Sequence, residues 1–122
     1  MSVRARLLVV DDEQSMREFL EIFFRKEGFE VQVASSVDEA LAFFDACEFD
    51  VVISDIQMPE RTGIELLKEV QRLSPETVVI MITAFSTTET AIDAMKLGAY
   101  DYITKPFKVD AIRLVVEKAL EK

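Results

Sequence analysis

The chain has 122 residues, half of them hydrophobic, and a formal net charge of -9. This size and apolar content suit one domain with one hydrophobic core, and the acidic balance argues against direct binding to nucleic acid or to an anionic membrane. No apolar stretch approaches the ~20 residues that span a bilayer, and residues 1–6 do not resemble a signal peptide. A cytoplasmic location is therefore expected.

The chain contains no histidine and a single cysteine, Cys47. Without histidine it cannot build a serine- or cysteine-type triad, most zinc sites or a histidine phosphodonor. Cys47 cannot form an internal disulfide, fits a reducing compartment and is expected to be a core residue near the end of a helix. Any chemistry must therefore use carboxylates, hydroxyls, lysines and a hard cation.

Apolar segments alternate with helical patterns along the chain, which is typical of βαβ units and a mainly parallel sheet. The expected strands are residues 7–10, 29–34, 51–53, 78–82 and 100–104. Those at 7–10, 51–53 and 78–82 are continuously apolar, as strands buried on both faces are. Residues 29–34 alternate between apolar and polar side chains, which predicts an edge strand.

Two helices are predicted before the third strand from apolar residues at helical spacing. The first ends at Gly28 as a left-handed cap, and its apolar face consists of Met16, Phe19, Leu20 and Phe23. The second follows the capping-box sequence Ser36-Val37-Asp38-Glu39, and its apolar face consists of Val37, Ala40, Leu41 and Phe44.

Three more helices are predicted after the later strands. The helix over about 63–73 cannot continue through Pro75, and it is marked by Leu66, Leu67, Val70 and Leu73. The next begins at a second capping-box sequence, Ser86-Thr87-Thr88-Glu89, stops at Gly98 and is marked by Ala91, Ile92 and Met95. The last has Asp110 as its N-cap and is marked by Ile112, Val115, Val116 and Ala119.

Polar side chains follow four of the expected strands at their carboxyl ends. They are Asp11 and Asp12, Asp55, Thr83, and Lys105. Because the carboxyl ends of parallel strands line one crevice, these groups should converge. Two carboxylates ~4 Å apart repel by ~4 kcal/mol at an effective dielectric of 20, so three of them need a cation, and oxygen ligands favour Mg²⁺. The pattern indicates a magnesium-assisted site for phosphorylating an aspartate.

Four motifs at these strand ends together resemble the receiver domain of two-component response regulators. They are Asp11-Asp12; Asp55 with Met58-Pro59 and Gly63; Thr83-Ala84; and Lys105-Pro106-Phe107. The resemblance covers essentially the whole chain, so residues 1–122 are expected to form a single receiver (phosphoacceptor) domain. It implies a flavodoxin-like (βα)5 three-layer sandwich whose parallel five-stranded sheet has the order 2-1-3-4-5.

The resemblance implies that Asp55 accepts a phosphoryl group from a sensor histidine kinase, its carboxylate acting as the nucleophile. It also implies that Asp12, Asp55 and the backbone carbonyl of Gln57 bind Mg²⁺ directly, that Asp11 acts through a bound water, and that Mn²⁺ can substitute. Gln57 and Phe85 flank the site and are expected to control water access. The protein would then be no enzyme in the usual sense, but a switch that assists its own phosphotransfer and dephosphorylation.

Lys105 and Thr83 would hold phosphoryl oxygens, the lysine as a compact charge and the threonine as a hydroxyl donor. On phosphorylation Thr83 is expected to swing inward, and Tyr102, at the family's aromatic switch position, to rotate from exposed to buried. The resemblance also suggests a cis Lys105–Pro106 bond. The sequence alone favours trans, because only ~5% of X–Pro bonds are cis.

Movement of Tyr102 would change the surface of the fourth helix, fifth strand and fifth helix. This surface carries charges that can pair in a symmetric homodimer: Lys96, Asp101, Arg113 and Glu117. Residues 80–107 look most like receivers of the nitrogen-regulatory type, which precede a sigma-54-activating ATPase and a DNA-binding domain. The chain has no P-loop or basic helix, so a transcriptional output domain is expected outside it, and its ending at residues 121–122 favours an excised receiver.

Three other functions fit the sequence less well. An FMN-binding flavodoxin needs a loop rich in Gly, Ser and Thr after the first strand, where this chain has Asp11-Asp12-Glu13. An aspartate-nucleophile phosphatase has an acid two residues after its nucleophile, where this chain has Gln57. A degenerate receiver, folded but never phosphorylated, would lack part of the acidic, hydroxyl and lysine set that is complete here.

Overall fold

The computed structural model describes residues 4–84 and 88–121, and it describes only the backbone of residues 88–91. Its five-stranded sheet is parallel throughout, and its strand order, β2-β1-β3-β4-β5, is the one that the resemblance implied. The strands are β1 (Arg6–Val10), β2 (Glu30–Ala34), β3 (Val51–Asp55), β4 (Val78–Thr83) and β5 (Asp101–Thr104). The alternating segment 29–34 does supply an edge strand, and the apolar runs supply the strands at the centre.

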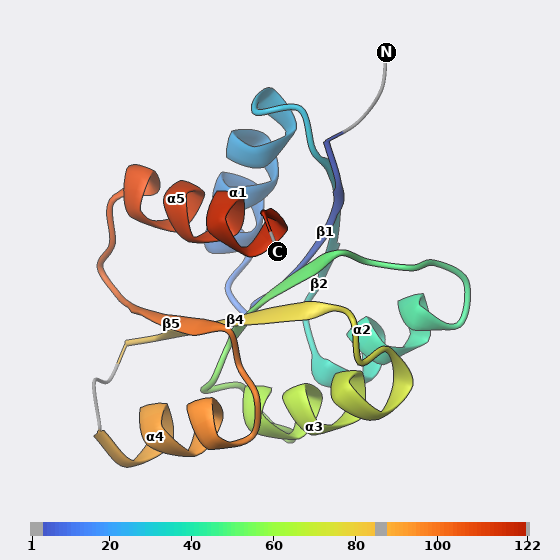
Figure 1. Ribbon diagram of the computed structural model, residues 1–122, viewed down its shortest axis with the longest axis vertical. Coiled ribbons are helices and arrows are strands. Elements are labelled where there is room, and N and C mark those ends of the chain that lie inside the picture. Colours follow the sequence, from blue (N-terminus) through green and yellow to red (C-terminus); the bar gives the residue numbers. More distant parts are fainter. Residues whose placement is uncertain (1–3, 85–87, 122) are drawn as a thin grey trace.

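Helices cover both faces of the sheet in a three-layer sandwich (Figure 1). One face carries α1 (Gln14–Lys26) and α5 (Val109–Leu120), and the other carries α2 (Val37–Phe44), α3 (Gly63–Leu73) and α4 (Thr88–Lys96). Each layer of helices shares a cluster of buried apolar side chains with one face of the sheet. β3, at the centre of the sheet, has all its residues buried. The flavodoxin-like fold predicted above is therefore confirmed.

The buried faces of α1 and α4 differ from the predicted ones. In α1 the buried residues are Leu20 and Phe24, whereas Phe19 is exposed. Phe24 was missed; it packs edge-on against Phe29, at the start of the edge strand. In α4 Ile92 and Met95 are exposed and Ala94 is fully buried. The other predicted residues of α1 do pack on the core, Leu20 fully buried and Met16 and Phe23 partly buried against it. The side chain of Ala91, also predicted for α4, lies outside the described part of the chain.

The helix ends confirm some of the sequence signals and correct others. The left-handed stops at Gly28 and Gly98 have φ of 96° and 103°. Ser36 caps α2 by accepting from the Glu39 N–H, but the Glu39 carboxylate bonds Ser35, so the capping box is incomplete. The prediction of Asp110 as an N-cap was wrong, because α5 already begins at Val109. The second predicted capping box, at 86–89, lies partly outside the described residues.

A complete capping box occurs where none was predicted, at the start of α3. The Thr62 hydroxyl accepts from the Glu65 N–H, and the Glu65 carboxylate accepts from the Thr62 N–H. This arrangement satisfies two helix N–H groups that have no partner within the helix. It fixes the first turn of α3 next to the carboxyl end of β3.

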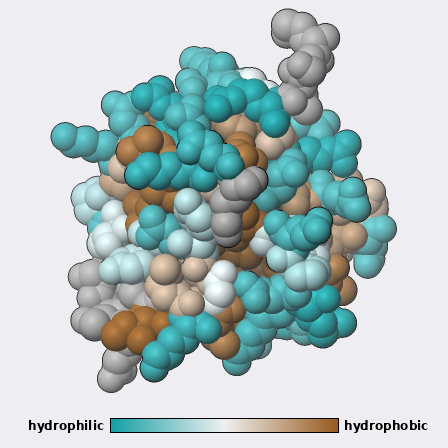
Figure 2. All heavy atoms as spheres, viewed as in Figure 1, coloured by the Kyte–Doolittle hydropathy of each residue, from teal (hydrophilic) through white to brown (hydrophobic). Residues whose placement is uncertain are grey.

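The surface is largely hydrophilic, with apolar groups exposed in places (Figure 2). On the face shown, one hydrophobic patch lies at the lower left, over α4. The large hydrophobic side chains exposed on α4 and in the turn after it are Ile92, Met95 and Leu97. No described helix combines the length and the apolar character needed to cross a bilayer.

Candidate functional site

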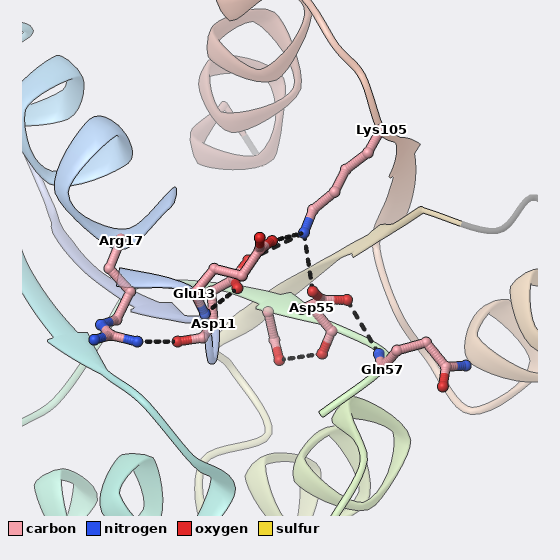
Figure 3. Close-up of polar contacts among 7 residues, drawn as sticks. Asp11, Glu13, Arg17, Asp55, Gln57 and Lys105 are labelled. Carbon is pink, nitrogen blue, oxygen red and sulfur yellow. Dashed lines mark hydrogen bonds and ion pairs between the residues drawn. The ribbon is translucent and has the colours of Figure 1, made fainter. Parts of the chain in front are cut away.

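The strand register brings the predicted acids and the lysine to one edge of the sheet. Val10 pairs with Ser54 across β1 and β3, so Asp11 and Asp55 follow at matching positions. Thr83 pairs with Thr104 across β4 and β5, and Lys105 comes next. Figure 3 shows the side chains of Asp11, Asp55 and Lys105 pointing toward one another above this edge. The convergence predicted from the strand ends is therefore present.

Lys105 bonds to three carboxylates at once. Its Nζ lies 2.9 Å from Asp55 Oδ2, 3.3 Å from Asp11 Oδ2 and 3.5 Å from Glu13 Oε1. Asp11 and Asp55 are buried, and the lysine is largely buried. A buried charge is tolerated only when it is paired and hydrogen-bonded. Lys105 thus already supplies part of the positive charge that these acids require.

The burial and the mutual charges shift two pKa values at the site. Burial raises the pKa of the Asp11 carboxyl, although the Glu13 N–H and Lys105 act in the opposite direction. Burial alone would lower the pKa of Lys105, but its hydrogen bond to Asp55 and the negative charges of Asp11 and Asp55 raise it. Lys105 is therefore fully protonated at neutral pH, and Asp11 is held in its charged form less firmly than an exposed aspartate.

Three acids could share one cation at this edge. Asp11, Asp12 and Asp55 each offer a carboxylate oxygen, and these oxygens lie within 4.8 Å of one another. Two of the acids are buried, and Asp12 is exposed. An all-oxygen donor set with one side open to water suits Mg²⁺, which keeps several waters when bound. The residues present therefore fit the predicted metal.

Both oxygens of Asp55 have hydrogen-bond donors. Oδ1 accepts from the backbone N–H of Gln57 at 3.0 Å, and Oδ2 accepts from Lys105. The backbone carbonyl of Asp55 accepts from the Ser54 hydroxyl at 2.9 Å. These contacts fix the orientation of the carboxylate, with the side chain of Gln57 directed away from it (Figure 3). Gln57 thus adjoins the site as predicted, through its backbone.

Gly63 explains the glycine in the motif that follows Asp55. A Cβ atom at this position would lie 2.3 Å from the Asp55 carbonyl oxygen and 2.7 Å from Met81 Cε. The Gly63 N–H donates to the Ile56 carbonyl at 2.9 Å. Only a residue without a side chain lets the start of α3 approach the end of β3 this closely. The glycine therefore sets the distance between α3 and the site.

Glu13 and Arg17 belong to the site, and the sequence analysis assigned them no role in it. The Glu13 N–H donates to Asp11 Oδ1 at 2.9 Å, and its carboxylate contacts Lys105. Arg17 Nη1 donates to the Asp11 carbonyl at 2.7 Å and so holds the segment between β1 and α1 (Figure 3). The position of Glu13 directly after two acids was a usable signal. Nothing in the sequence distinguished Arg17 from other helix-surface arginines.

Thr83 and Tyr102 connect the site edge to the surface. Thr83 is buried at the end of β4, and its carbonyl accepts from the Lys105 N–H at 2.7 Å. Tyr102 lies on β5 opposite Met81 and is 40% exposed.

The Lys105–Pro106 bond is cis, as the resemblance suggested and the sequence alone did not. Phe85, predicted to flank the site, lies outside the described residues.

Two of the charges expected to pair across a dimer have partners within the chain. Arg113 bonds Asp110 at 2.7 Å and lies 3.9 Å from Glu27. Glu117 bonds Arg4 at 3.1 Å. Arg113 and Glu117 would have to break these ion pairs to form new ones across a dimer. They are therefore weaker candidates for dimer contacts than Lys96, which is exposed on α4.

The chain is similar to known proteins in both sequence and structure. The family model described as the response regulator receiver domain matches residues 7–117. Regulatory protein AtoC of Escherichia coli is 42% identical over 99% of this chain and 26% of its own length. Response regulator protein PilR of Pseudomonas aeruginosa is 38% identical over 96% of this chain and 26% of its own length. The chain thus spans about a quarter of these curated relatives.

Two solved structures show the same fold. NtrX from Brucella abortus has a TM-score of 0.91 and 40% identity, covering 96% of this chain and 27% of that one. A response regulator receiver domain protein from Clostridium thermocellum has a TM-score of 0.90 and 34% identity, covering 96% of this chain and 94% of that one. The similarity therefore extends over the whole sandwich and includes the strand ends that carry the site.

Proposed function

This chain belongs to the response regulator receiver domain family of two-component systems, and from that premise we propose that Asp55 accepts a phosphoryl group from a sensor histidine kinase. Members of this family are signalling switches rather than ordinary enzymes. One observation supports the proposal most strongly: Asp55 is buried, is held by donors at both oxygens, and faces a lysine and two further acids. Asp11 is also buried with a donor at each oxygen, so the choice of Asp55 over Asp11 rests on the motif that follows it, Met58-Pro59 and Gly63.

The phosphotransfer step uses the Asp55 carboxylate as the nucleophile. A lone pair of one oxygen attacks phosphorus, the P–N bond to the donor imidazole breaks, and the nitrogen keeps that electron pair and is reprotonated. In dephosphorylation, water attacks the phosphorus of the acyl phosphate and the P–O bond to Asp55 breaks. Inorganic phosphate is released and the Asp55 carboxylate is restored. The Gln57 N–H keeps Asp55 oriented, since it bonds the oxygen that Lys105 does not.

Asp12, Asp55 and the Gln57 carbonyl would hold Mg²⁺, or Mn²⁺ in its place, with Asp11 acting through a water. The oxygen-only donor set and the spacing of the three acids support this assignment. When bound, the ion neutralises charge on the phosphoryl oxygens and favours in-line transfer. Asp11 already pairs with Lys105 through Oδ2 and accepts from the Glu13 N–H through Oδ1, which supports an indirect role toward the metal.

Lys105 changes partners during this reaction. It bonds Asp55 Oδ2 before transfer, and that oxygen or its neighbour becomes part of the acyl phosphate. Its ammonium then pairs with a phosphoryl oxygen instead, as a compact positive charge can. Thr83, at the end of the adjacent strand β4, donates its hydroxyl to another phosphoryl oxygen. The phosphoryl group added to Asp55 carries a charge of roughly -1.5 to -2. Lys105 and Thr83 respond to this added charge by bonding to its oxygens.

The signal then passes from Thr83 to the surface formed by α4, β5 and α5. Tyr102 is exposed in this structure, as expected for the unphosphorylated state, and it rotates inward once Thr83 moves toward the phosphoryl group. The altered surface controls a homodimer contact or an output domain. Another relative, transcriptional regulatory protein ZraR of Salmonella typhimurium, is 42% identical over 93% of this chain, and its name supports a transcriptional output. The resemblance of residues 80–107 to nitrogen-regulatory receivers supports an output of the sigma-54 activator type.

Intact-mass measurement after incubation with Mg²⁺ and acetyl phosphate tests the proposal. One phosphoryl group should be added to the wild-type chain, and none to Asp55→Asn, which keeps the size of the side chain but lacks the nucleophile. Omission of Mg²⁺ should slow the addition strongly. Addition to Asp55→Asn at the wild-type rate would overturn the assignment of the acceptor.

A further inference from the structure

Glu13 occupies a helix position whose usual function it does not perform. It is the N-cap residue of α1, yet its side chain makes no capping hydrogen bond. N-caps are normally Ser, Thr, Asp or Asn, whose short side chains accept from the free N–H groups of the first turn. The Glu13 carboxylate instead turns to Lys105 Nζ at 3.5 Å (Figure 3). Hydrogen-bonded capping of α1 therefore does not account for the position of this carboxylate.

The surroundings place this carboxylate at the entrance to the site. Its backbone N–H is fixed by Asp11 Oδ1 at 2.9 Å. The Glu13 side chain is 61% exposed, whereas that of Lys105 is 14% exposed and that of Asp11 is 2% exposed. Of the three carboxylates that contact Lys105, Glu13 is the one in contact with solvent. A phosphodonor arriving from solvent therefore meets its negative charge on the way to Asp55.

Resting on the proposed function, we propose that Glu13 is a specificity-determining residue that selects against small anionic phosphodonors. Its carboxylate competes with the incoming phosphoryl oxygens for Lys105 and repels the donor's own charge. Neither effect alters the transfer step, in which an Asp55 oxygen bonds to phosphorus while the bond from phosphorus to the donor's leaving group breaks, releasing acetate from acetyl phosphate or ammonia from phosphoramidate. A donor borne on a protein surface can offset this repulsion through its other contacts, whereas a free metabolite cannot.

The two effects of Glu13 are separable by donor charge. Competition for Lys105 affects all phosphoryl donors alike, but Coulomb repulsion grows with the charge of the donor. Acetyl phosphate is a dianion near neutral pH, and phosphoramidate carries one negative charge less. The repulsion also weakens as added salt shortens the Debye length, from about 10 Å at 0.1 M to about 3 Å at 1 M. A purely structural role for Glu13 would show neither dependence.

The experiment compares initial phosphorylation rates of the whole chain at saturating Mg²⁺ with acetyl phosphate and with phosphoramidate. Glu13→Gln removes the charge, and Glu13→Lys reverses it. The matched control is Glu18→Gln, which makes the same change of net charge on the exposed surface of α1, where the Glu18 carboxylate accepts a hydrogen bond from Gln14. All these positions are exposed, so the variants should fold.

Glu13→Gln should react about threefold faster than wild type with acetyl phosphate at low salt and less than twofold faster with phosphoramidate. Glu13→Lys should increase both rates further, again more for acetyl phosphate than for phosphoramidate. Salt at about 0.5 M should remove most of the difference between the two donors. The Glu18→Gln rates should equal the wild-type rates. Equal acceleration of both donors, or no acceleration beyond that of Glu18→Gln, would overturn the inference. Failure of the wild-type chain to react at all would instead contradict the proposed function.

Discussion

Two neighbouring helices on the same face of the sheet, α3 and α4, are held in very different ways. α3 begins with a complete capping box and buries Gly63, Leu66, Leu67 and Val70. In α4, among the side chains described from Ile92 to Lys96, Ala94 alone is buried. Ile92 and Met95 are 44% and 43% exposed. α3 is thus anchored by its start and its core face, whereas in the part of α4 whose side chains are described, from Ile92 to Lys96, one small residue is buried.

Under the proposed function, this difference would separate the helix that supports the phosphorylated site from the helix that transmits the change. α3 touches the site directly, because Gly63 lies against the backbone of Asp55 and cannot move without disturbing it. α4 follows the strand that ends at Thr83 and lies beside β5, which carries Tyr102. Elements with few buried apolar contacts shift at low free-energy cost. Phosphorylation at a rigid site can therefore be transmitted by displacing α4 and leaving α3 in place.

The largest expected effect is on stability, when a large apolar side chain of each helix is truncated: a buried one in α3 and an exposed one in α4. Leu67→Ala in α3 should lower the free energy of unfolding by about 2–5 kcal/mol, because Leu67 is fully buried and its removal leaves a cavity. Met95→Ala in α4 should change it by no more than about 0.5 kcal/mol, since exposed side chains lose little on truncation. Urea denaturation of both variants measures the contrast. Equal losses would mean that α4 is anchored as firmly as α3.

A smaller effect is expected from relieving charge at the site without touching either helix. In the metal-free protein, Asp11→Asn should raise the free energy of unfolding by on the order of 1 kcal/mol at neutral pH, because it removes one of three mutually repelling acids. Burial raises the pKa of Asp11, so the folded wild type binds this proton more tightly than the unfolded chain. Wild-type stability attributable to Asp11 therefore falls as pH rises above about 3.9.

The advantage of Asp11→Asn should accordingly be absent below about pH 4 and should grow as pH rises through the raised pKa of Asp11. Denaturation curves recorded from pH 3 to pH 7 at constant ionic strength would show this. Glu18→Gln serves as the control, since it removes an exposed acid on α1 that accepts a hydrogen bond from Gln14. A gain that is the same at every pH would show that the packing of the asparagine, and not charge, is responsible.

The smallest expected effect concerns the link between the two helices. Gln71 on α3 donates from Nε2 to the carbonyl of Gly98, in the turn after α4, at 3.1 Å. Because this hydrogen bond is exposed, Gln71→Ala should lower the free energy of unfolding by about 0.5 kcal/mol, the low end of the net contribution of one hydrogen bond. Its main consequence should be faster amide exchange in α4 with unchanged exchange in α3. Arg72→Ala, which loses a bond to Glu69 within α3, is the neighbouring control.

The sequence was sufficient to predict the sheet and the residues at its functional edge. Continuous apolar runs predicted the central strands, and alternation predicted the edge strand β2, because burial on one face or both leaves those patterns. The acids and Lys105 were predictable because each directly follows such a run. Strand order came from the resemblance, since periodicity carries no information about which strands are neighbours. The metal ligands and the role of each site residue remain predictions.

Where sequence analysis failed, the determining contacts were distant along the chain. The spacing of apolar residues predicted the period of α1 and α4 but not every residue that each helix buries, because this depends on contacts with distant residues. Phe24 is buried in contact with Phe29, and the small side chain of Ala94 is fully buried. The contact between Glu13 and Lys105 joins residues 92 positions apart, and no local pattern indicates it. The start of α5 was misplaced because Asp110 resembles an N-cap residue but lies in the first turn.

Amide hydrogen exchange of the wild-type chain, compared with and without acetyl phosphate in the presence of Mg²⁺, tests the central claim most directly. The Asp55→Asn variant under both conditions is the control for effects of the reagent. Phosphorylation should change exchange in α4 and β5 and leave α3 unchanged, because the phosphoryl group on Asp55 moves the loosely held helix and not the anchored one. Equal changes in α3 and α4, or changes that also occur in Asp55→Asn, would contradict the account.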